Sequence, residues 1–271
     1  MVNNYICASN KRTILQRNRM KKTLYYFLIF PIFLSAQINE SDTLNLKASL
    51  SITGFYQGGN VETLIFRAKT DLSFKPWKNW VFKNQNSYVY QEFGKEKADE
   101  DILSLNFLYL NPERKIYPFV LGFVSTNFRR VIDLRYLLGA GATFQILNKK
   151  NNWLKFSISS EYEQTDFSKT NFNYSEYDGN QFINTFRGTI WVNGKYHLFK
   201  NKIILNHESY FQPSLKEGKN FRWQADIGLE LPIRKFLNFK INYRHTYESI
   251  VIENQKQEDK FLTFGFTLKS Y

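Results

Sequence analysis

Apolar and polar residues alternate along most of the chain after residue 37. In residues 44–56, apolar or small side chains occupy the even-numbered positions and polar side chains occupy most of the odd-numbered ones. The same period of two recurs in residues 63–75 and again in residues 260–271. Successive side chains of a β-strand point to opposite faces, whereas a helix repeats about every 3.6 residues. The pattern therefore predicts an all-β chain.

Twelve segments with this alternation follow one another, and no long helical period lies between them. The predicted strands are 44–56, 63–75, 80–91, 102–110, 117–126, 134–147, 153–164, 182–198, 203–212, 221–231, 237–247 and 260–271.

The connections between these segments alternate in length. Those after the even-numbered strands are tight, for example PWKN and FKNK, whereas most of the others are longer and polar, for example residues 165–181. Short turns on one side and long loops on the other are typical of transmembrane barrels. A strand of about 12 residues, tilted by about 40°, spans roughly 30 Å, which is enough for their apolar band. The sequence thus predicts a single closed antiparallel up-and-down transmembrane β-barrel in residues 37–271.

The last segment favours lipid over a soluble core. Its residues Leu262, Phe264, Phe266 and Leu268 share one face and continue almost to the end of the sequence. Lipid cannot pair with the open edge of a strand, so the last strand is expected to pair with the first. Tyr and Trp residues also gather near predicted strand ends, as in the aromatic girdles of membrane proteins. A secreted soluble β protein, which also buries one face of each strand, is the alternative.

Residues 80–91 depart from the pattern. The face that carries aromatic residues at both ends of this segment also carries Asn84 and Asn86 in the middle. The segment is therefore expected either to contain a bulge or to have a different register.

The N-terminal 36 residues have the features of an extension followed by a secretory signal peptide. Lys21 and Lys22 precede an apolar run from Leu24 to Ala36, which is too short to span a bilayer. Cleavage is expected between Ala36 and Gln37. The alternative is an N-terminal anchor helix. Export, combined with a barrel, indicates the outer membrane of a Gram-negative cell.

Charge and cysteine content narrow the function classes. The formal net charge is +13, but residues 1–36 contain six Lys or Arg and no acid, so the mature chain carries +7. Much of the basicity belongs to export, and no nucleic-acid partner is expected. The one cysteine, Cys7, lies in the removed segment, which excludes disulfides from the mature barrel. The mean hydropathy of −0.44 does not exclude a barrel, because half of each strand faces a polar lumen.

The polar faces of the strands carry charges of both signs, which we place in the lumen. Buried charges need partners or water. The balance of signs predicts a ladder of ion pairs that mostly fills the lumen, and an open, ion-selective pore is the alternative. The predicted lumen-facing charges are Arg67, Asp71, Arg135, Glu161, Arg187, Asp226 and Arg244, together with Lys69, Glu163, Lys195, Glu208 and Lys240.

One short motif suggests chemistry. His207 and Ser209, in NHESY, share a strand face and resemble the His-x-Ser of outer-membrane phospholipase A. That motif continues with Asn-Gly, whereas this chain continues with Tyr210 and Phe211. An ordinary pair near a strand end is the interpretation we prefer, and an outer-membrane lipid hydrolase is the alternative. We therefore predict no catalytic residue, no cofactor-binding residue and no enzymatic activity.

The remaining polar clusters do not form a recognisable site. The three histidines, His197, His207 and His245, lie on three strands without ligand spacing, so no metal is expected. The acidic tract around residues 96–101 lacks the spacing of a calcium loop and is interpreted as a solvated loop. Arg129 and Arg130 are placed in an outer loop, where lipopolysaccharide phosphates are candidate ligands. The expected partners are outer-membrane lipids, lipopolysaccharide and the barrel-assembly machinery.

Several segments, in order along residues 48–271, resemble one family. They are GFYQGGNVETLIFRAKTDLSF, DLRYLLGAGATFQIL with Arg135, Gly139 and Gly141, QPSL with NFRW after it, and Asp259 before the closing strand. These segments resemble the YdiY-like family of salt-induced outer-membrane proteins of unknown function. The resemblance implies an outer-membrane β-barrel and little about activity. We expect a structural or stress-related envelope component, or a narrow channel.

Overall fold

The computed structural model describes residues 40–41, 46–58, 62–149 and 151–269. The predicted cleavage site at Ala36 and Gln37 lies outside the described residues, so the signal peptide stays a prediction. One compact unit, Leu34–Tyr271, contains the barrel, and the other, Met1–Phe33, is outside the described part.

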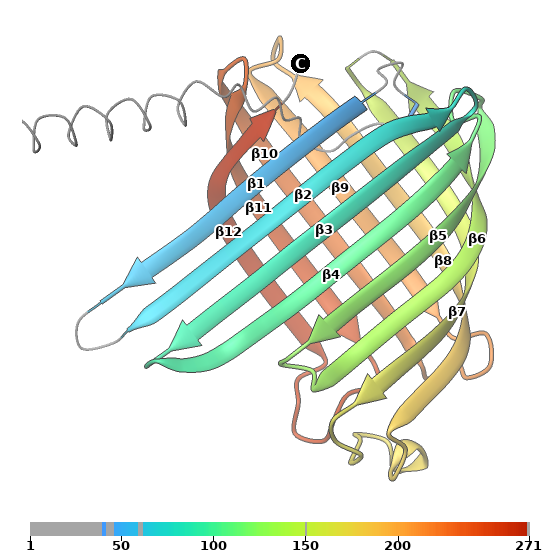
Figure 1. Cartoon of the computed structure of the whole chain (residues 1–271), viewed down its shortest axis with the longest axis vertical. Coiled ribbons are helices and arrows are strands. Elements are labelled where there is room, and N and C mark those ends of the chain that lie inside the picture. The colour runs from blue at the N-terminus through green and yellow to red at the C-terminus, as the bar shows by residue number, and fades with distance from the viewer. Residues whose placement is uncertain (1–39, 42–45, 59–61, 150, 270–271) are drawn as a thin grey trace, which may run out of the picture. The chain divides into compact units, whose positions relative to one another are not determined.

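Twelve strands in the described residues form a closed barrel (Figure 1). Each strand pairs antiparallel with its sequence neighbours, and β1 pairs with β12. The fold class predicted from the alternation is therefore confirmed. The strands are β1 (Leu46–Gln57), β2 (Thr63–Trp77), β3 (Trp80–Phe93), β4 (Glu96–Leu110), β5 (Ile116–Asn127), β6 (Ile132–Asn148), β7 (Trp153–Phe167), β8 (Phe182–Leu198), β9 (Ile203–Pro213), β10 (Phe221–Arg234), β11 (Leu237–Glu248) and β12 (Glu258–Lys269).

Closure explains the strand near the end of the sequence. β12 pairs with β11 from Tyr247↔Glu258 to Leu237↔Leu268, and with β1 from Ser49↔Lys269 to Ile52↔Phe266. Both edges of β12 are thus paired, which satisfies backbone groups that lipid could not.

The two ends of the barrel differ. The turns after β2, β4, β6, β8 and β10, together with the start of β1 and the end of β12, define the turn end, and the other connections define the loop end. In outer-membrane barrels the short turns face the periplasm.

The connection between β3 and β4 is shorter than the sequence suggested. Gly94 and Lys95 alone join the two strands, and both have a positive φ, as a tight hairpin turn requires. The acidic tract of residues 96–101 is therefore part of β4, and its interpretation as a solvated loop is wrong. A charged segment near the end of a strand resembles a loop in the sequence. Here the backbone of this segment pairs with β3.

The long connection between β7 and β8 is structured. It contains the short 3-10 helix η1 (Ser175–Tyr177), and Phe172 forms a β-bridge with Ile252 of the β11–β12 connection. Phe172, Tyr177 and Ile252 belong to a buried apolar cluster at the loop end. In the described part of the chain, no helix is long and apolar enough to cross a bilayer.

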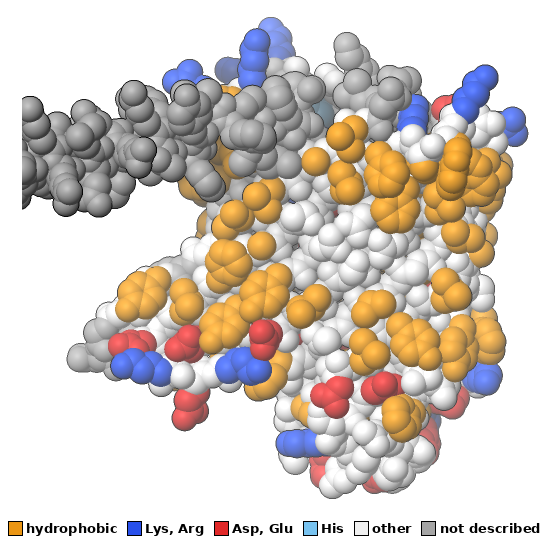
Figure 2. Space-filling model, in the orientation of Figure 1, with side chains coloured by type: hydrophobic (Ala, Val, Ile, Leu, Met, Phe, Trp, Pro, Cys, Tyr) orange, Lys and Arg blue, Asp and Glu red, His pale blue; other side chains and the backbone are white. Residues whose placement is uncertain are grey.

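Apolar side chains cover much of the outer surface. On β12, Leu262, Phe264 and Phe266 are exposed, each by more than half of its area. Figure 2 shows hydrophobic side chains spread over the visible face of the barrel. Large exposed apolar areas of this kind require a lipid environment. Most strands therefore present apolar residues outward and polar ones to the lumen.

One wall differs from this arrangement. Leu105, Phe107 and Tyr109 on β4, with Phe119 and Leu121 on β5, face the lumen and are buried in one cluster. Phe107 and Phe119 pack edge to face, with ring centroids 5.6 Å apart. The expectation that apolar faces look outward throughout is wrong for this wall. Packed rings fill part of the lumen and bury their area against each other instead of against lipid.

Neither alternative proposed for residues 80–91, a bulge or a different register, applies at Asn84 and Asn86. β3 pairs with β2 and β4 without interruption through Asn84 and Asn86. The register shifts between Phe74 and Trp77 in the pairing of β2 with β3, and between Gln91 and Glu92 in the pairing of β3 with β4. The two amides face outward in a regular strand.

Candidate functional site

The lumen contains a cavity of about 370 Å³. Among the described residues that line it are eight Lys or Arg and nine Asp or Glu, so its charge is nearly balanced. Nine of the twelve charges that we placed in the lumen by register line this cavity: Arg67, Lys69, Asp71, Arg135, Glu161, Glu208, Asp226, Lys240 and Arg244. Arg187 and Glu163 are 2 % and 1 % exposed and pair with each other beside the cavity. Lys195 is not among the residues that line it.

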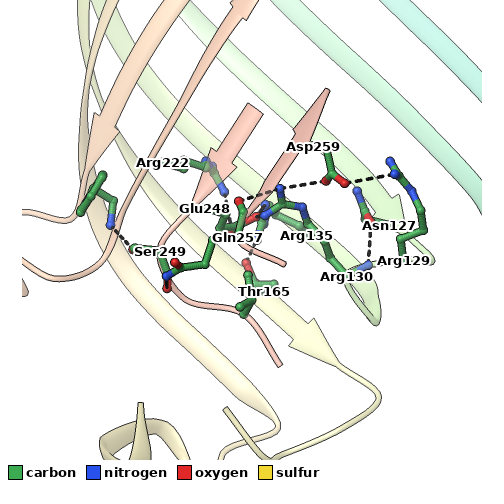
Figure 3. A network of polar contacts seen from close by, with 12 residues as sticks. Asn127, Arg129, Arg130, Arg135, Thr165, Arg222, Glu248, Ser249, Gln257 and Asp259 are labelled. Carbon is green, nitrogen blue, oxygen red and sulfur yellow. Dashed lines mark hydrogen bonds and ion pairs between the residues drawn. The ribbon is translucent and has the colours of Figure 1, made fainter. Parts of the chain in front are cut away.

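Glu248, the last residue of β11, forms ion pairs with three arginines at the loop end of the lumen. Arg135 on β6 donates to its carboxylate, and Arg130 Nη1 lies 3.0 Å from Glu248 Oε2 (Figure 3). Arg222 Nη1 lies 3.8 Å from Glu248 Oε1. Three guanidinium groups from β6, β10 and the β5–β6 connection therefore converge on one carboxylate.

Asp259 extends this network towards β4. Its Oδ2 accepts a hydrogen bond of 3.0 Å from Arg130 Nη2, and its Oδ1 accepts one of 3.1 Å from Arg129 Nη1. Arg129 Nε lies 2.8 Å from Asp99 Oδ2 on β4. The two arginines suggested for lipopolysaccharide phosphates thus form ion pairs within the barrel.

Glu163 on β7 is the second centre of the network. Arg187 binds it in a bidentate manner, with Nε 2.9 Å from Oε2 and Nη2 3.0 Å from Oε1. Arg222 Nη2 also donates to Oε2, and Arg135 Nε lies 3.8 Å from Oε1. Glu163 is 1 % exposed, so these pairs are shielded from water and from salt.

Ion pairs and hydrogen-bonded carboxylates continue through the middle of the lumen. Arg244 Nε donates to Asp226 Oδ2 at 2.8 Å. Asp71 accepts hydrogen bonds from Gln85 at 2.6 Å and from Ser49 at 3.2 Å. The register of neighbouring strands brings these groups together, because directly opposite side chains share a face.

Glu40 occupies the lumen at the turn end. Its Oε1 lies 2.8 Å from Lys155 Nζ and accepts a hydrogen bond of 2.7 Å from the Tyr117 hydroxyl, and Lys83 Nζ lies 3.9 Å from Oε2. Ser41 Oγ donates to the carbonyl of Pro112 at 2.5 Å. Burial opposes ionisation, but Lys155, Lys83 and the two hydrogen bonds outweigh it and lower the pKa of Glu40 to about 2.

Sequence reasoning missed this contact. Glu40 lies four residues after the expected cleavage site and is far in sequence from Lys83 and Lys155. The available signal was that both lysines lie on inward strand faces opposite residues without a negative charge. Those residues are Ser73, Phe107, Gln145 and Asn193. No local pattern identifies Glu40 as their partner.

His207 and Ser209 lie on the outward face of β9, because Asn206 and Gln212 face inward and Phe211 is exposed. The His207 ring stacks on Tyr196, and its Nε2 lies 3.4 Å from the Tyr196 hydroxyl. Among the described residues, no hydrogen bond joins His207 to Ser209, and no cluster of His, Cys, Asp or Glu could hold a metal ion.

A closed barrel with lipid-facing apolar side chains and an ionic lumen defines an integral outer-membrane β-barrel protein. The chain belongs to the family described as "Protein of unknown function, DUF481", which matches residues 50–269. The family suggested by the YdiY-like segments is thus confirmed.

One solved structure shows the same fold at low identity, and two others are less similar. The NanC porin is 10% identical with a TM-score of 0.51, and the match covers 82% of this chain and 99% of that one. The translocator domain of the autotransporter NalP from Neisseria meningitidis is 11% identical with a TM-score of 0.42, covering 97% and 98%. OmpT of Vibrio cholerae is 8% identical with a TM-score of 0.38, covering 86% and 99%. No curated protein sequence matches the chain.

Proposed function

We propose that the protein is a narrow outer-membrane channel for small hydrophilic solutes, closed at rest by Glu40 at the turn end. The observation that carries this proposal is the polar cavity of about 370 Å³ inside a barrel whose turn end is occupied by one short segment. The NanC porin shares the fold, which supports the proposal without identifying a solute.

The ion-pair networks limit what passes. The arginines on Glu163 and Glu248 narrow the loop end, and Glu40 with its lysines narrows the turn end. The nearly balanced charges of the cavity favour weak discrimination between anions and cations, because rings of charged side chains select ions when the ring carries one sign. We therefore expect small, weakly selective openings.

The alternative function is a structural or stress-related envelope component without transport. Its support is the extent of the buried ion-pair networks, which fit a lumen that stays filled. The two functions differ in whether release of Glu40 opens a path.

Planar-bilayer recording tests the proposal. The purified wild-type protein should show rare, brief openings, and Glu40→Ala should raise the open probability at least tenfold. The matched control is Glu113→Ala, which removes an exposed carboxylate from a turn at the same end. Folded Glu40→Ala protein that conducts no more than Glu113→Ala would favour the structural role.

A lipid hydrolase is not favoured, because His207 contacts Tyr196. A phospholipid assay in detergent, with wild type and Ser209→Ala, separates this activity from contamination. Turnover that disappears with Ser209→Ala would establish the enzyme.

A further inference from the structure

A group of uncharged polar side chains lies on the outer surface of β2, β3 and β4. Its members, which we call the amide patch, are Thr70, Asn84, Asn86, Ser104 and Asn106. Asn84 Nδ2 donates to Asn106 Oδ1 at 2.8 Å, and Asn86 Nδ2 donates to Asn84 Oδ1 at 2.6 Å and to Thr70 Oγ1 at 3.3 Å. Hydrogen bonds thus connect the patch across three strands.

The amide patch lies near the middle of the apolar band. Asn84 and Asn86 are each four residues from an outward aromatic residue, Trp80 on one side and Tyr90 on the other. Four residues at about 3.3 Å each, tilted by about 40°, separate the amides from those rings by roughly 10 Å along the barrel axis. Figure 2 shows a pale area over the middle of this wall, with hydrophobic side chains above and below it. The patch is therefore at hydrocarbon depth.

Hydrocarbon is a poor environment for these groups. A carboxamide has two N–H donors and an oxygen with two lone pairs, and acyl chains offer no partner to any of them. Other strands carry large apolar residues on their outward faces, since Ile227 and Leu229 on β10 and Phe264 and Phe266 on β12 are exposed. One wall of the barrel thus carries polar groups that a protein partner would satisfy better than lipid.

The chemistry of the amide patch indicates which partner. Its side chains are neutral and act as both donors and acceptors, so a second copy of the same surface supplies matching groups under two-fold symmetry. Gly122 on β5 pairs with Asn106, and a Cβ added there would have no heavy atom within 4 Å. A small residue beside the amides lets a second backbone approach closely. We propose that the amide patch is the interface of a homodimer in the plane of the membrane.

Disulfide crosslinking tests the proposal in intact outer membranes. The sequence contains one cysteine, so a Cys7→Ser background leaves no native thiol. Asn86→Cys in that background should give a crosslinked species of twice the monomer mass under mild oxidation. The matched control is Ser160→Cys, an exposed outward position in the middle of β7. It should give at least tenfold less dimer.

A second variant checks the role of the amides themselves. Asn84→Leu, Asn86→Leu and Asn106→Leu combined remove the polar groups and suit a lipid-facing surface, so the barrel should still fold and show heat-modifiable gel mobility. The dimer fraction of this variant, measured by single-molecule photobleaching in bilayers, should fall at least fivefold relative to wild type.

Three results would overturn the homodimer. They are equal crosslinking at positions 86 and 160, crosslinking of Asn86→Cys to a different protein or to nothing, and a triple variant that dimerises as wild type does. The last result would place any dimer contact elsewhere on the barrel.

Discussion

Protonation of Glu40 should open the turn end of the barrel. In the docked state its carboxylate contacts Lys155 at 2.8 Å and the Tyr117 hydroxyl at 2.7 Å, and it is 3 % exposed. A protonated carboxyl keeps a hydrogen bond but loses the attraction of Lys155 and Lys83. The free energy that holds Glu40 in the lumen then decreases.

The size of the effect follows from the pKa of Glu40, which lies at about 2 instead of its ordinary 4.5. At about 1.4 kcal/mol per pKa unit, ionisation stabilises docking by roughly 3–4 kcal/mol, which is a few hundredfold in the docking equilibrium. Because docking lowers the pKa, it releases a proton and weakens as the pH falls. The stabilisation is complete well above pH 4.5 and is lost between there and about pH 2.

Single-channel recording between pH 7 and pH 3 measures this change. The open probability of the wild type should be low and constant down to about pH 5 and then rise steeply. Glu40→Gln removes the charge at every pH, so its open probability should be high at pH 7 and nearly independent of pH. Glu113→Gln should behave as wild type, since that residue is exposed.

A Glu40→Gln protein with the same steep acid response as wild type would refute the role of Glu40. Another carboxylate would then control the opening. A wild type that closes on acidification would contradict the sign of the linkage.

Two further predictions concern stability. Glu163→Gln leaves Arg187 and Arg222 buried against a neutral amide, so it should lower the free energy of unfolding by about 3–5 kcal/mol in urea titrations. Glu176 is exposed, so Glu176→Gln should change this free energy little. Equal effects of the two substitutions would refute the role of the network. Gly141→Ala should lower the free energy of unfolding by about 1–3 kcal/mol, because a Cβ there would lie 2.2 Å from the Ile158 carbonyl oxygen. Gly122→Ala is the control, because a Cβ at Gly122 has no heavy atom within 4 Å. Equal stabilities of the two variants would show that β6 and β7 are not packed as described.

The alternation of residues predicted the strands well because one environment acts on each face of a barrel. Residues 260–268 illustrate this, since lipid on one side and the lumen on the other require opposite polarity. The same rule placed Asp226 and Arg244 on the inner face, where register makes them neighbours.

The rule failed where the environment was not uniform. On β4 and β5, Phe107 and Phe119 pack against each other inside the lumen, and the period of two does not say which face is inside. At the loop end, residues 96–101 form the first part of β4, where charges on both faces of the strand resemble a loop in the sequence.

The site at the turn end was not predictable from local pattern. Glu40 reaches Lys155 across more than a hundred residues, and only the closed barrel brings them together. The amide patch was visible as a defect in residues 80–91, but its extension to Thr70 and Asn106 depends on the register of three strands.

The most direct test of the barrel's inside and outside is cysteine labelling along β12 in intact outer membranes, in the Cys7→Ser background. Thr263→Cys faces the lumen, so it should react with a small water-soluble thiol reagent, and Phe264→Cys should not. A fluorophore at position 264 should be quenched by brominated acyl chains, and one at position 263 should not. The reverse pattern, with position 264 in water and position 263 in lipid, would contradict the account.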